Sequence, residues 1–328
     1  MNKPDISIII VSFNTVDLLR DCLQSLAKEA GNVNYETIII DNGSRDGSAD
    51  MVECEFPEAK LIRSDINLGF GAANNLGFAK ARGEYVVLLN SDAFLKPQAL
   101  EKSLAYMQAD STIGLGGARL VGAKEEWQPS ARMFPSLLNE FITTSGLGDK
   151  YPKSRFFGRV DRTWADPNQA AMVDWVPGAF SIIPRRVLEE VGYFNEDFFL
   201  YYEEVELCKR IKSAGYNIWY WPDVVVTHLG GESSKTLTQF SMSDSGKQIY
   251  LWEMRSALLF YRKHYGKFSA WLWLYMKRLW FKLRTWKNSF SKQTERKNKA
   301  ALFTTVQKLL KQAWVDTEGG RISPPRPW

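Results

Sequence analysis

The sequence predicts an α/β protein: a mostly parallel, Rossmann-like sheet with flanking helices, followed by a C-terminal helical extension. Strand and helix signals alternate through residues 1–95, which is the pattern of a parallel sheet wrapped by helices. Each apolar strand in this part ends in a polar cluster. From about residue 241 onward the chain becomes helical, basic and aromatic. We therefore expect one α/β unit with a helical appendage.

The N-terminal strands are expected to be buried on both faces, because they are nearly continuous apolar and β-branched runs. They lie at residues 6–13, 36–41, 59–64 and 84–94. Residues 17–30 carry leucines at helical spacing, and Asn14 or Thr15 is available to cap that helix. Residues 67–83 form a Gly-rich entry followed by a helix of small residues.

After Pro97 the pattern is looser. We expect a helix at 97–110, a strand at 113–121, long loops with short helices at 125–174, and a strand, turn and helix within 173–194. An amphipathic helix at 203–216 reaches Gly215, a suitable C-cap residue. Two short strands follow at 217–221 and 224–228, and the boundary of the α/β unit is expected between residues 235 and 245.

Composition excludes several classes of protein. With 328 residues, 45% of them hydrophobic and 13% aromatic, the chain can bury a sizeable core and is not generally disordered. Cys22, Cys54 and Cys208 are too widely spaced to indicate a disulfide framework or a zinc site, so a reducing cytoplasm is expected. The N-terminal apolar run is too short for a signal peptide, and no uninterrupted apolar run is long enough to span a membrane.

The polar clusters at the strand ends predict the site. In open α/β sheets, ligands bind in the crevice beyond the carboxyl ends of the strands. Three clusters would face that crevice: Ser12 and Asn14; Asp41, Asn42 and Ser44; and Asn90, Ser91 and Asp92.

Two of these carboxylates have alternative interpretations. Asp92, placed beyond the strand, could bind Mg²⁺ or Mn²⁺, which take oxygen ligands and are often completed by substrate phosphates. It could instead cap the helix that follows. Asp41 could accept a hydrogen bond from a pyrimidine base or only organise its turn. The pair Gly69 and Gly71 is a weak dinucleotide signal, because Asn74 stands where a third glycine is needed.

The order of the motifs resembles that of the inverting family 2 glycosyltransferases of the GT-A fold, the nucleotide-diphospho-sugar transferase fold. The stretches are "SIIIVSFN", "IIIDNGSRDGS", "NLGFGAANNLG", "LLNSDA", "WVPGAF" and "FNEDFFLYYEEVELCKR". The bacterial rhamnosyltransferase-like branch, which builds cell-surface polysaccharide such as O-antigen, also has counterparts of "QPSARMFPS" and "RSALLFYRKHYG". The resemblance covers roughly residues 5–266. It implies a catalytic domain at 1–240, with a nucleotide-sugar half at about 1–95 and an acceptor half at about 96–240, and an extension at 241–328.

The resemblance also implies roles for single residues on the donor side. The nucleotide would be held by Ser12, Asn14 and Asp41, with Asn67, Gly69 and Asn74 close by. Asp92 matches the last Asp of the family's D-x-D motif and would bind the divalent cation that bridges the diphosphate. Asn90 replaces the first Asp, and Ser91 lies between them. His228 would reach the metal or the diphosphate, although a buried structural histidine is an open alternative.

The same resemblance implies the base and the acceptor side. The family's Glu-Asp pair at a helix start falls on Glu203 and Glu204, so Glu204 takes the place of the base and Glu203 is a second candidate. Such a base would remove the proton of the attacking acceptor hydroxyl. Alternatively, both are simply anions stabilised by a helix N-terminus. The acceptor side would contain Asp174, Trp175, Gly178 and Ala179, for which packing is the alternative.

The C-terminal extension indicates a membrane surface. Residues 268–286 mix Trp, Tyr and Leu with Lys277, Arg278, Lys282 and Arg284, as in a helix that lies at the interface of an anionic bilayer. A helix packed on the catalytic domain is the alternative. Nucleic acid is not expected as a partner, because it would leave the strand-end carboxylates without a role.

The sequence as a whole predicts a glycosyltransferase at the cytoplasmic face of the inner membrane. It would move a sugar, rhamnose being one candidate, from a dTDP-, UDP- or GDP-sugar to a glycan or polyprenyl-linked acceptor. The rival interpretation is an inactive nucleotide- or glycan-binding scaffold of the same fold, suggested by Asn90 and Glu204.

Overall fold

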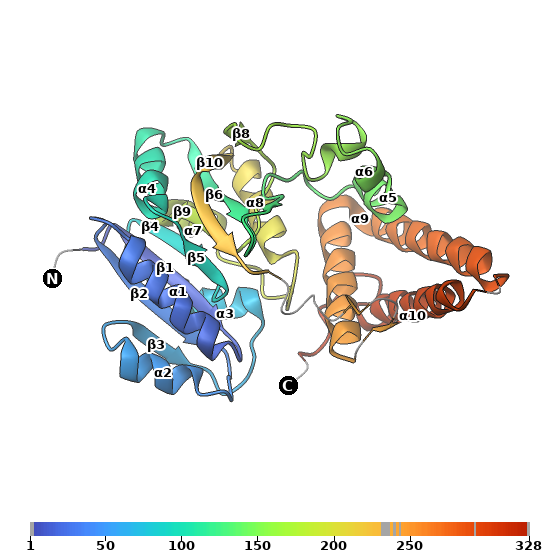
Figure 1. Ribbon diagram of the computed structural model, residues 1–328, viewed down its shortest axis with the longest axis horizontal. Coiled ribbons are helices and arrows are strands. Elements are labelled where there is room, and N and C mark those ends of the chain that lie inside the picture. Colours follow the sequence, from blue (N-terminus) through green and yellow to red (C-terminus); the bar gives the residue numbers. More distant parts are fainter. Residues whose placement is uncertain (1–2, 231–236, 239–240, 243, 292, 327–328) are drawn as a thin grey trace.

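The computed structural model describes residues 3–230, 237–238, 241–242, 244–291 and 293–326. A helix-covered sheet forms one half of the molecule, and the helices of the C-terminal extension form the other (Figure 1). The boundary expected at 235–245 falls partly on residues outside the described ranges.

The main sheet is mixed, with the strand order β3-β2-β1-β4-β9-β6-β10-β5. Four parallel strands form its first half: β1 (Ile6–Ser12), β2 (Tyr35–Asp41), β3 (Lys60–Arg63) and β4 (Tyr85–Leu89). β9 (Phe180–Pro184) lies antiparallel between β4 and β6 (Ile113–Val121). β6 pairs in parallel with β10 (Asn217–His228), and the edge strand β5 (Ala93–Leu95) is antiparallel to β10. The shorter strands are β7 (Trp127–Gln128), β8 (Ala171–Met172), β11 (Leu237–Thr238) and β12 (Ser241–Met242).

The structure corrects three details of the predicted elements. The two strands expected at 217–221 and 224–228 are one strand, β10, whose register with β6 shifts between Trp221 and Val225. The strand expected at 84–94 is two strands, β4 and β5, separated by residues 90–92. The helix α2 (Ser48–Glu55) was not predicted, because it is short and its sequence carries little periodicity to detect.

Helices cover both faces of the sheet. The helices α1 (Val16–Glu29), α2 and α4 (Ala99–Ala109) share one hydrophobic core with the sheet. A second core on the opposite face includes residues of α3 (Phe70–Phe78), α7 (Arg185–Val191) and α8 (Glu203–Ser213). β1 contributes Ile8 and Ile10 to the first core and Ile9 to the second, because successive side chains of a strand point to opposite faces.

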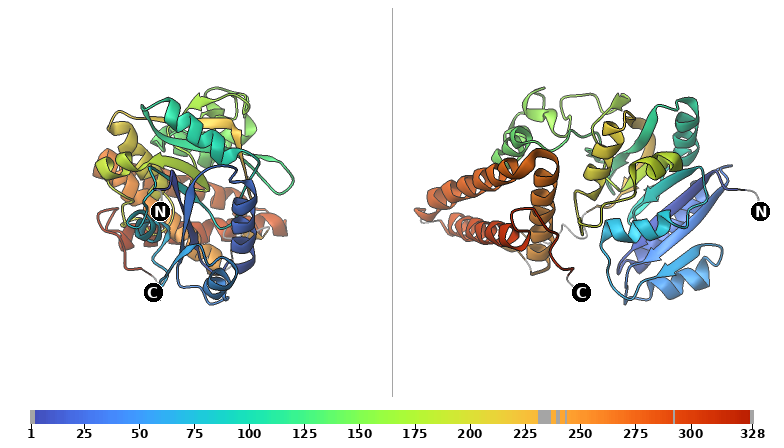
Figure 2. Two further views of the ribbon diagram at one scale, coloured as in Figure 1. Left: turned by 90° about the vertical axis from the view of Figure 1, so that its left-hand side faces the viewer. Right: turned by 180° about the vertical axis from the view of Figure 1, so that it is seen from behind.

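The second half of the molecule is built from long helices around a third core. α9 (Asp244–Ser289) bends where Gly266, with φ 86°, interrupts its helical backbone. The two arms of α9 and α10 (Thr294–Asp316) form a triangle beside the sheet (Figure 2). α5 (Leu137–Ser145), α6 (Leu147–Lys150) and a 3-10 turn at Phe157–Arg159 lie in the long connection between β7 and β8. In the described part of the chain, no helix is long and apolar enough to cross a membrane.

Candidate active site

Hydrogen bonds join the carboxyl ends of β1 and β4. The Ser12 and Thr15 hydroxyls lie 3.0 Å apart, and the Thr15 hydroxyl donates to Ser91 Oγ at 3.0 Å. At the neighbouring end of β2, Asp41 is 5% exposed. Its Oδ2 accepts from the Ser44 amide, whereas Oδ1 has no hydrogen-bond partner among the described residues. This strand edge therefore holds a carboxylate oxygen that is available to a ligand.

Three asparagines predicted near the nucleotide already have structural partners. Asn14 Oδ1 accepts from the Arg45 amide at 2.8 Å. Asn67 Oδ1 accepts from the Gly69 amide at 2.9 Å and so shapes the Gly-rich turn. The buried Asn74 donates to the Phe70 carbonyl at 2.9 Å, within its own helix. Asn14 and Asn67 therefore position loops at the strand ends, whereas the side-chain amide of Asn74 stabilises the helix α3.

Gly69 brings the Gly-rich turn against a distant segment. Its φ is 84°, and a Cβ at this position would lie 2.3 Å from the carbonyl oxygen of Phe199. The neighbouring Phe70 amide donates to that same carbonyl at 3.1 Å. Only glycine satisfies both the positive φ and this close approach. The donor-side turn is thus fixed to the loop that leads into α8.

Asp92 and His228 meet where β5 pairs with β10. The His228 Nε2 lies 3.5 Å from Asp92 Oδ1, and the His228 Nδ1 lies 3.1 Å from Gln128 Oε1. If Nδ1 carries the proton and donates to Gln128, the lone pair of Nε2 faces Asp92. Burial lowers the pKa of His228, which favours this neutral form. Gln128, which sequence reasoning missed, therefore orients the imidazole from the outer side.

This pair of ligands suits a divalent cation that completes its shell with substrate oxygens. Carboxylate and imidazole are both ligands for Mn²⁺, and phosphate oxygens commonly supply the rest. Asn90 lies two residues before Asp92 in the sequence, and its buried Oδ1 has no hydrogen-bond partner among the described residues. Across the described ranges, no group of three or more His, Cys, Asp or Glu residues could hold a metal ion. The carboxylate of Asp92 and the imidazole of His228 are donor groups that would suit a metal bound together with a diphosphate.

The two candidate bases start a helix after strained backbone. Tyr201 and Tyr202 have φ values of 66° and 69°, a conformation that is uncommon for residues other than glycine. They turn the chain so that α8 begins at Glu203. Strain of this kind persists only where surrounding structure holds it, and it is frequent at functional sites.

Glu203 and Glu204 differ in environment although they are adjacent. Glu203 is only 4% exposed, and its Cβ lies beside the backbone of Gly71. Burial raises the pKa of Glu203 well above its usual value, and the neighbouring Glu204 adds to the rise. Glu204 is half-buried; burial also raises its pKa, but the positive charge of Arg132 opposes the rise. Of the two residues, Glu204 is the less buried, and the charge of Arg132 favours its ionised form.

Arg132 is a further candidate for the site, and sequence reasoning did not assign it. It lies in the "QPSARMFPS" stretch, which we used only for the resemblance. Its guanidinium pairs with Asp161 at 2.6 Å and lies 4.8 Å from the ring centre of Trp175. It therefore links Glu204 to Trp175, one of the predicted acceptor-side residues.

The other predicted acceptor-side residues have mainly structural contacts. Asp174 pairs with Lys212 at 2.7 Å and accepts from the Phe134 amide at 3.0 Å. A Cβ at Gly178 would lie 3.3 Å from the ring of Phe70. Ala179 is buried, and its carbonyl accepts from the Asn90 amide at 3.1 Å. Trp175 is the residue of this set whose surroundings best suit ligand contact.

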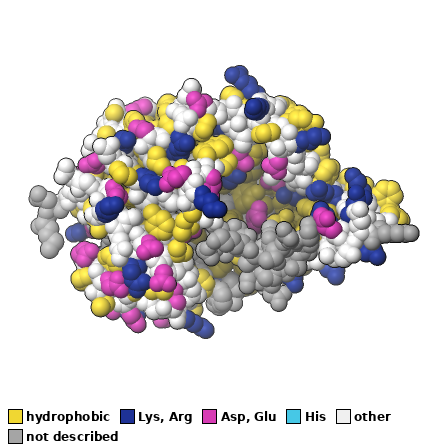
Figure 3. Space-filling model, in the orientation of Figure 1, with side chains coloured by type: hydrophobic (Ala, Val, Ile, Leu, Met, Phe, Trp, Pro, Cys, Tyr) yellow, Lys and Arg dark blue, Asp and Glu magenta, His cyan; other side chains and the backbone are white. Residues whose placement is uncertain are grey.

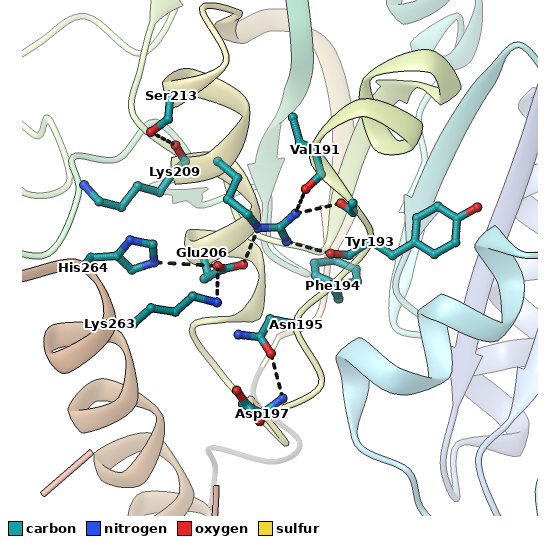
Figure 4. A network of polar contacts seen from close by, with 12 residues as sticks. Val191, Tyr193, Phe194, Asn195, Asp197, Glu206, Lys209, Ser213, Lys263 and His264 are labelled. Atoms are coloured by element: carbon teal, nitrogen blue, oxygen red, sulfur yellow. Dashed lines mark hydrogen bonds and ion pairs between the residues drawn. The ribbon is translucent and has the colours of Figure 1, made fainter. Parts of the chain in front are cut away.

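Glu206 anchors α8 to the C-terminal helices. It is completely buried, yet it pairs with Arg210 at 2.8 Å and with Lys263 of α9 at 2.9 Å, and His264 Nε2 lies 3.7 Å away (Figure 4). Arg210 also donates to the carbonyls of Val191, Gly192 and Tyr193 (Figure 4). Glu206 thus holds together three segments around the start of α8.

The first arm of α9 supports the strained loop from the side opposite to the Gly-rich turn. Trp252 packs on Phe199 with ring centres 4.6 Å apart, and Ser256 donates to the Leu200 carbonyl at 2.8 Å. The molecular face is hollowed between the sheet half and these helices, and hydrophobic and acidic side chains line the hollow (Figure 3). The C-terminal extension therefore contributes to the shape of the site.

Comparisons with known proteins agree with this architecture. The family model described as Glycosyl transferase family 2 matches residues 7–163. The N-acetylglucosaminyl-diphospho-decaprenol L-rhamnosyltransferase of Mycobacterium tuberculosis is 27% identical over 202 residues; the match covers 58% of this chain and 65% of that protein, slightly less than two thirds of its length. Rhamnosyltransferase WbbL of Escherichia coli K12 is 27% identical over 243 residues, 70% of this chain and 85% of that protein. A mannosyltransferase from Pyrobaculum calidifontis, solved with GDP-Man and Mn²⁺, has a similar fold, with a TM-score of 0.53 at 16% identity over 97% of this chain and 88% of that one.

Proposed function

Residues 7–163 carry a family 2 glycosyltransferase domain, and the chain has the GT-A fold; on this premise we propose that the protein is an inverting glycosyltransferase. It moves a sugar from a nucleotide-diphosphate donor to a glycan or polyprenyl-linked acceptor in the synthesis of cell-surface polysaccharide. A dTDP-, UDP- or GDP-sugar is the donor, and rhamnose is the first sugar to test, because two similar proteins are rhamnosyltransferases.

The observation that carries the proposal is the contact of the Gly-rich turn with the loop that leads into α8, which brings two unlike sets of residues near one another. On one side, the ends of β1, β2 and β4 bring together hydroxyls and the free oxygen of Asp41, which suit a nucleotide. On the other side, Glu204 has a raised pKa beside Arg132. A carboxylate with a pKa closer to neutral is a better general base than an ordinary surface Glu.

Asp92 and His228, oriented by Gln128, would hold the divalent cation. When bound, the cation neutralises the charge that develops on the leaving diphosphate. Glu204 accepts the proton of the acceptor hydroxyl as that oxygen attacks the anomeric carbon from the face opposite the diphosphate. A single displacement of this geometry inverts the anomeric configuration. Glu203 is buried and its pKa is raised by that burial, so it supports Glu204 rather than replacing it.

The test is a comparison of donor binding with sugar transfer. Thermal unfolding with dTDP-, UDP- and GDP-sugars, with and without Mn²⁺, should reveal one donor that raises the stability of the native state. Glu204→Gln should keep that stabilisation but lower transfer to extracted bacterial lipid-linked glycans by about 10²–10⁴-fold. Glu189→Gln, at an exposed pair with Arg185, is the control and should leave transfer unchanged.

Other results would reject the proposal. Equal transfer by wild type and Glu204→Gln would remove Glu204 as the base. Donor binding without transfer by either protein would favour the inactive scaffold. No binding of any nucleotide sugar would exclude the transferase and a nucleotide-binding scaffold, and would leave only a glycan-binding scaffold.

The site of action that we propose is the cytoplasmic face of the inner membrane. The second arm of α9, together with Phe290 just after it, carries an exposed stripe of large apolar side chains with a spacing of three or four residues, so that those on the helix share one face: Phe268, Trp271, Tyr275, Leu279, Leu283, Trp286 and Phe290. The exposed cations Lys267, Arg278, Lys282 and Lys287 accompany it. Hydrophobic and basic side chains are visible at this end of the molecule (Figure 3). Aromatic and basic residues on one helix suit an anionic bilayer surface.

A further inference from the structure

A second pocket, away from the strand ends, is basic and aromatic. It lies in the connection between α6 and β8 and is lined by Lys153, Arg155, Arg162, Trp164, Ala165, Asp166, Gln169, Ala170 and Ala171. None of its three cationic side chains has a carboxylate partner among the described residues, although most arginines at the opposite end of the molecule are paired. The only acidic residue of the lining is Asp166, whose Oδ1 accepts two hydrogen bonds from Asn168.

The two arginines are held in place by one ring. The guanidinium carbons of Arg155 and Arg162 lie 4.8 and 5.4 Å from the ring centre of Trp164. Stacking on an aromatic face leaves the N–H groups at the edge of a guanidinium free to donate. Two guanidinium groups that are fixed in advance lose less conformational entropy when they bind a ligand. The pocket is thus prepared to receive a compact anion that accepts several hydrogen bonds.

Phosphate groups match this arrangement best. Arginine binds phosphate with two parallel N–H···O bonds, and Lys153 adds a third positive charge. Three cations against one carboxylate leave a net positive pocket, which suits a diphosphate better than a singly charged carboxylate ligand. Arg162 adopts a left-handed backbone conformation, with φ 50°, which is uncommon for a residue of this type.

The pocket adjoins the acceptor side of the candidate active site. A neighbouring smaller pocket shares Arg162 and Asp166 with it and is also lined by Asp161 and Ala131. Asp161 pairs with Arg132, which acts on Glu204 and stacks on Trp175. One chain of contacts therefore runs from the basic pocket to the proposed base.

We propose that the pocket around Trp164 binds the diphosphate of a lipid-linked acceptor, with Arg155, Arg162 and Lys153 as its ligands. This inference rests on the proposed function, because it assigns the phosphate-bearing part of the acceptor to a site separate from that of the donor. The pocket would hold the acceptor by its diphosphate while the sugar hydroxyl faces Glu204.

The test is calorimetric titration of the full chain with inorganic pyrophosphate and with geranyl diphosphate. EDTA in the buffer keeps the metal-dependent donor side from contributing. Both probes should bind the wild type, and Arg155→Ala/Arg162→Ala should lose at least ten-fold in affinity for each. Lys80→Ala/Lys124→Ala, which removes two exposed cations elsewhere, is the charge-matched control and should bind as the wild type does. Asp92→Asn should also bind equally, because it alters only the donor side.

A second variant covers the case in which the double alanine variant does not fold. Arg155→Lys/Arg162→Lys keeps both charges but removes the bidentate donors, and it should bind with intermediate affinity. The inference would be overturned if neither probe bound the wild type, or if both arginine variants bound the probes with the affinity of the wild type. A further outcome would also overturn the inference. If neither diphosphate binds, but the wild type binds vesicles that contain phosphatidylglycerol and the arginine variants do not, the pocket is assigned to lipid headgroups.

A separate readout distinguishes this inference from the proposed function. The stabilisation by nucleotide sugar and Mn²⁺ should be the same in the wild type and in Arg155→Ala/Arg162→Ala. If donor binding persists but diphosphate binding is absent in the wild type, only the assignment of this pocket fails. If no nucleotide sugar binds at all, the proposed function fails whatever the pocket does.

Discussion

At the scale of single residues, the site depends on a difference between neighbouring glutamates. Glu203 is enclosed beside Gly71, whereas Glu204 is half-buried and influenced by Arg132. Ionisation of both neighbouring carboxyls is unfavourable because the two negative charges repel each other. Their environments therefore determine which carboxyl ionises more readily. Burial raises the pKa of Glu203 well above its usual value, whereas the charge of Arg132 opposes the rise in the pKa of Glu204.

Glu203→Gln should stabilise the protein at neutral pH. The pKa of Glu203 is raised in the folded state, so folding is penalised above pH about 4.3, where the unfolded chain loses this proton. We expect a gain of about 1–3 kcal/mol in the free energy of unfolding at pH 7. The gain should vanish near pH 4, where the carboxyl is protonated in both states.

Urea unfolding at pH 4 and pH 7 measures this difference. Glu53→Gln, which removes an exposed carboxylate paired with Arg63, is the control and should change stability little at either pH. If Glu203→Gln is less stable than the wild type at pH 7, the folded protein stabilises the ionised carboxylate of Glu203, and the prediction is wrong.

Arg132→Gln should shift the acid side of the pH–rate profile. Arg132 lowers the pKa of Glu204, so its removal lets that pKa rise further. The base then stays protonated up to a higher pH, and transfer should fall several-fold more at pH 6 than at pH 8. Arg119→Gln, which loses a contact to Asn168 and a positive charge that acts on Tyr220, serves as the matched control. An equal loss at both pH values would mean that Arg132 positions the acceptor without acting on Glu204.

At the scale of elements, the loop before α8 is held from two sides. The Gly-rich turn contacts its Phe199 carbonyl, and α9 supports Phe199 and Leu200 from the other side. This arrangement explains how Tyr201 and Tyr202 keep their left-handed backbone. It also ties the start of α8 to both the donor half and the C-terminal extension.

Glu206→Gln should destabilise the joint between α8 and α9. Glu206 is fully buried, and its neutralisation leaves Arg210 and Lys263 without their shared carboxylate. Loss of one partner from a buried ion pair costs about 3–5 kcal/mol. The pKa of His264 is lowered to about 4 by burial, so this histidine is neutral at pH 7 and does not add a third charge.

Chemical denaturation at pH 7 would measure the loss. Glu125→Gln breaks an exposed pair with Lys96 and should cost about 1 kcal/mol or less. A similar small cost for Glu206→Gln would show that the two halves of the molecule do not depend on this joint.

Elements with a strong local pattern could be predicted from the sequence, and those set by distant partners could not. The apolar runs of β1, β2 and β4 and the leucine spacing of α1 are local signals, and the structure has these elements within a few residues. β5 exists because it pairs with β10, far away in the sequence. β10 continues through Pro222 because β6 accommodates a shift of register there.

The candidate site likewise combines residues that local patterns predict with residues whose roles depend on distant partners. Strand ends and the GT-A resemblance brought Ser12, Asp41, Ser91 and Asp92 to one edge in prediction, and the structure gathers them there. Arg132 and Gln128 were not assigned, because their roles come from side chains met across the fold: Asp161 and Trp175 for one, His228 for the other. The spacing of residues in a single sequence does not reveal contacts of this kind.

At the scale of the whole molecule, the stripe on the second arm of α9 is a large exposed apolar surface. The residues of the stripe are 43–73% exposed, and neighbouring rings pack on one another: ring centres lie 5.4 Å apart for Trp271 and Tyr275 and 5.5 Å apart for Trp286 and Phe290. The helical part of the stripe, from Phe268 to Ser289, extends over about 33 Å. Water-exposed apolar area of this extent indicates an interaction surface.

Removal of two indoles from this stripe should release the protein from anionic membranes. Trp271→Ser/Trp286→Ser should weaken co-sedimentation with vesicles of phosphatidylethanolamine and phosphatidylglycerol by about ten-fold or more, because each buried indole contributes apolar area. Val315→Ser/Ile322→Ser, at exposed positions outside the stripe, should bind as the wild type does. Binding of the wild type should weaken in high salt and with uncharged phosphatidylcholine, since the basic side chains act through screened charges. Unchanged binding of the double tryptophan variant would exclude the stripe as the membrane surface, and a dimer that dissociates in this variant would assign the stripe to a second copy of the chain.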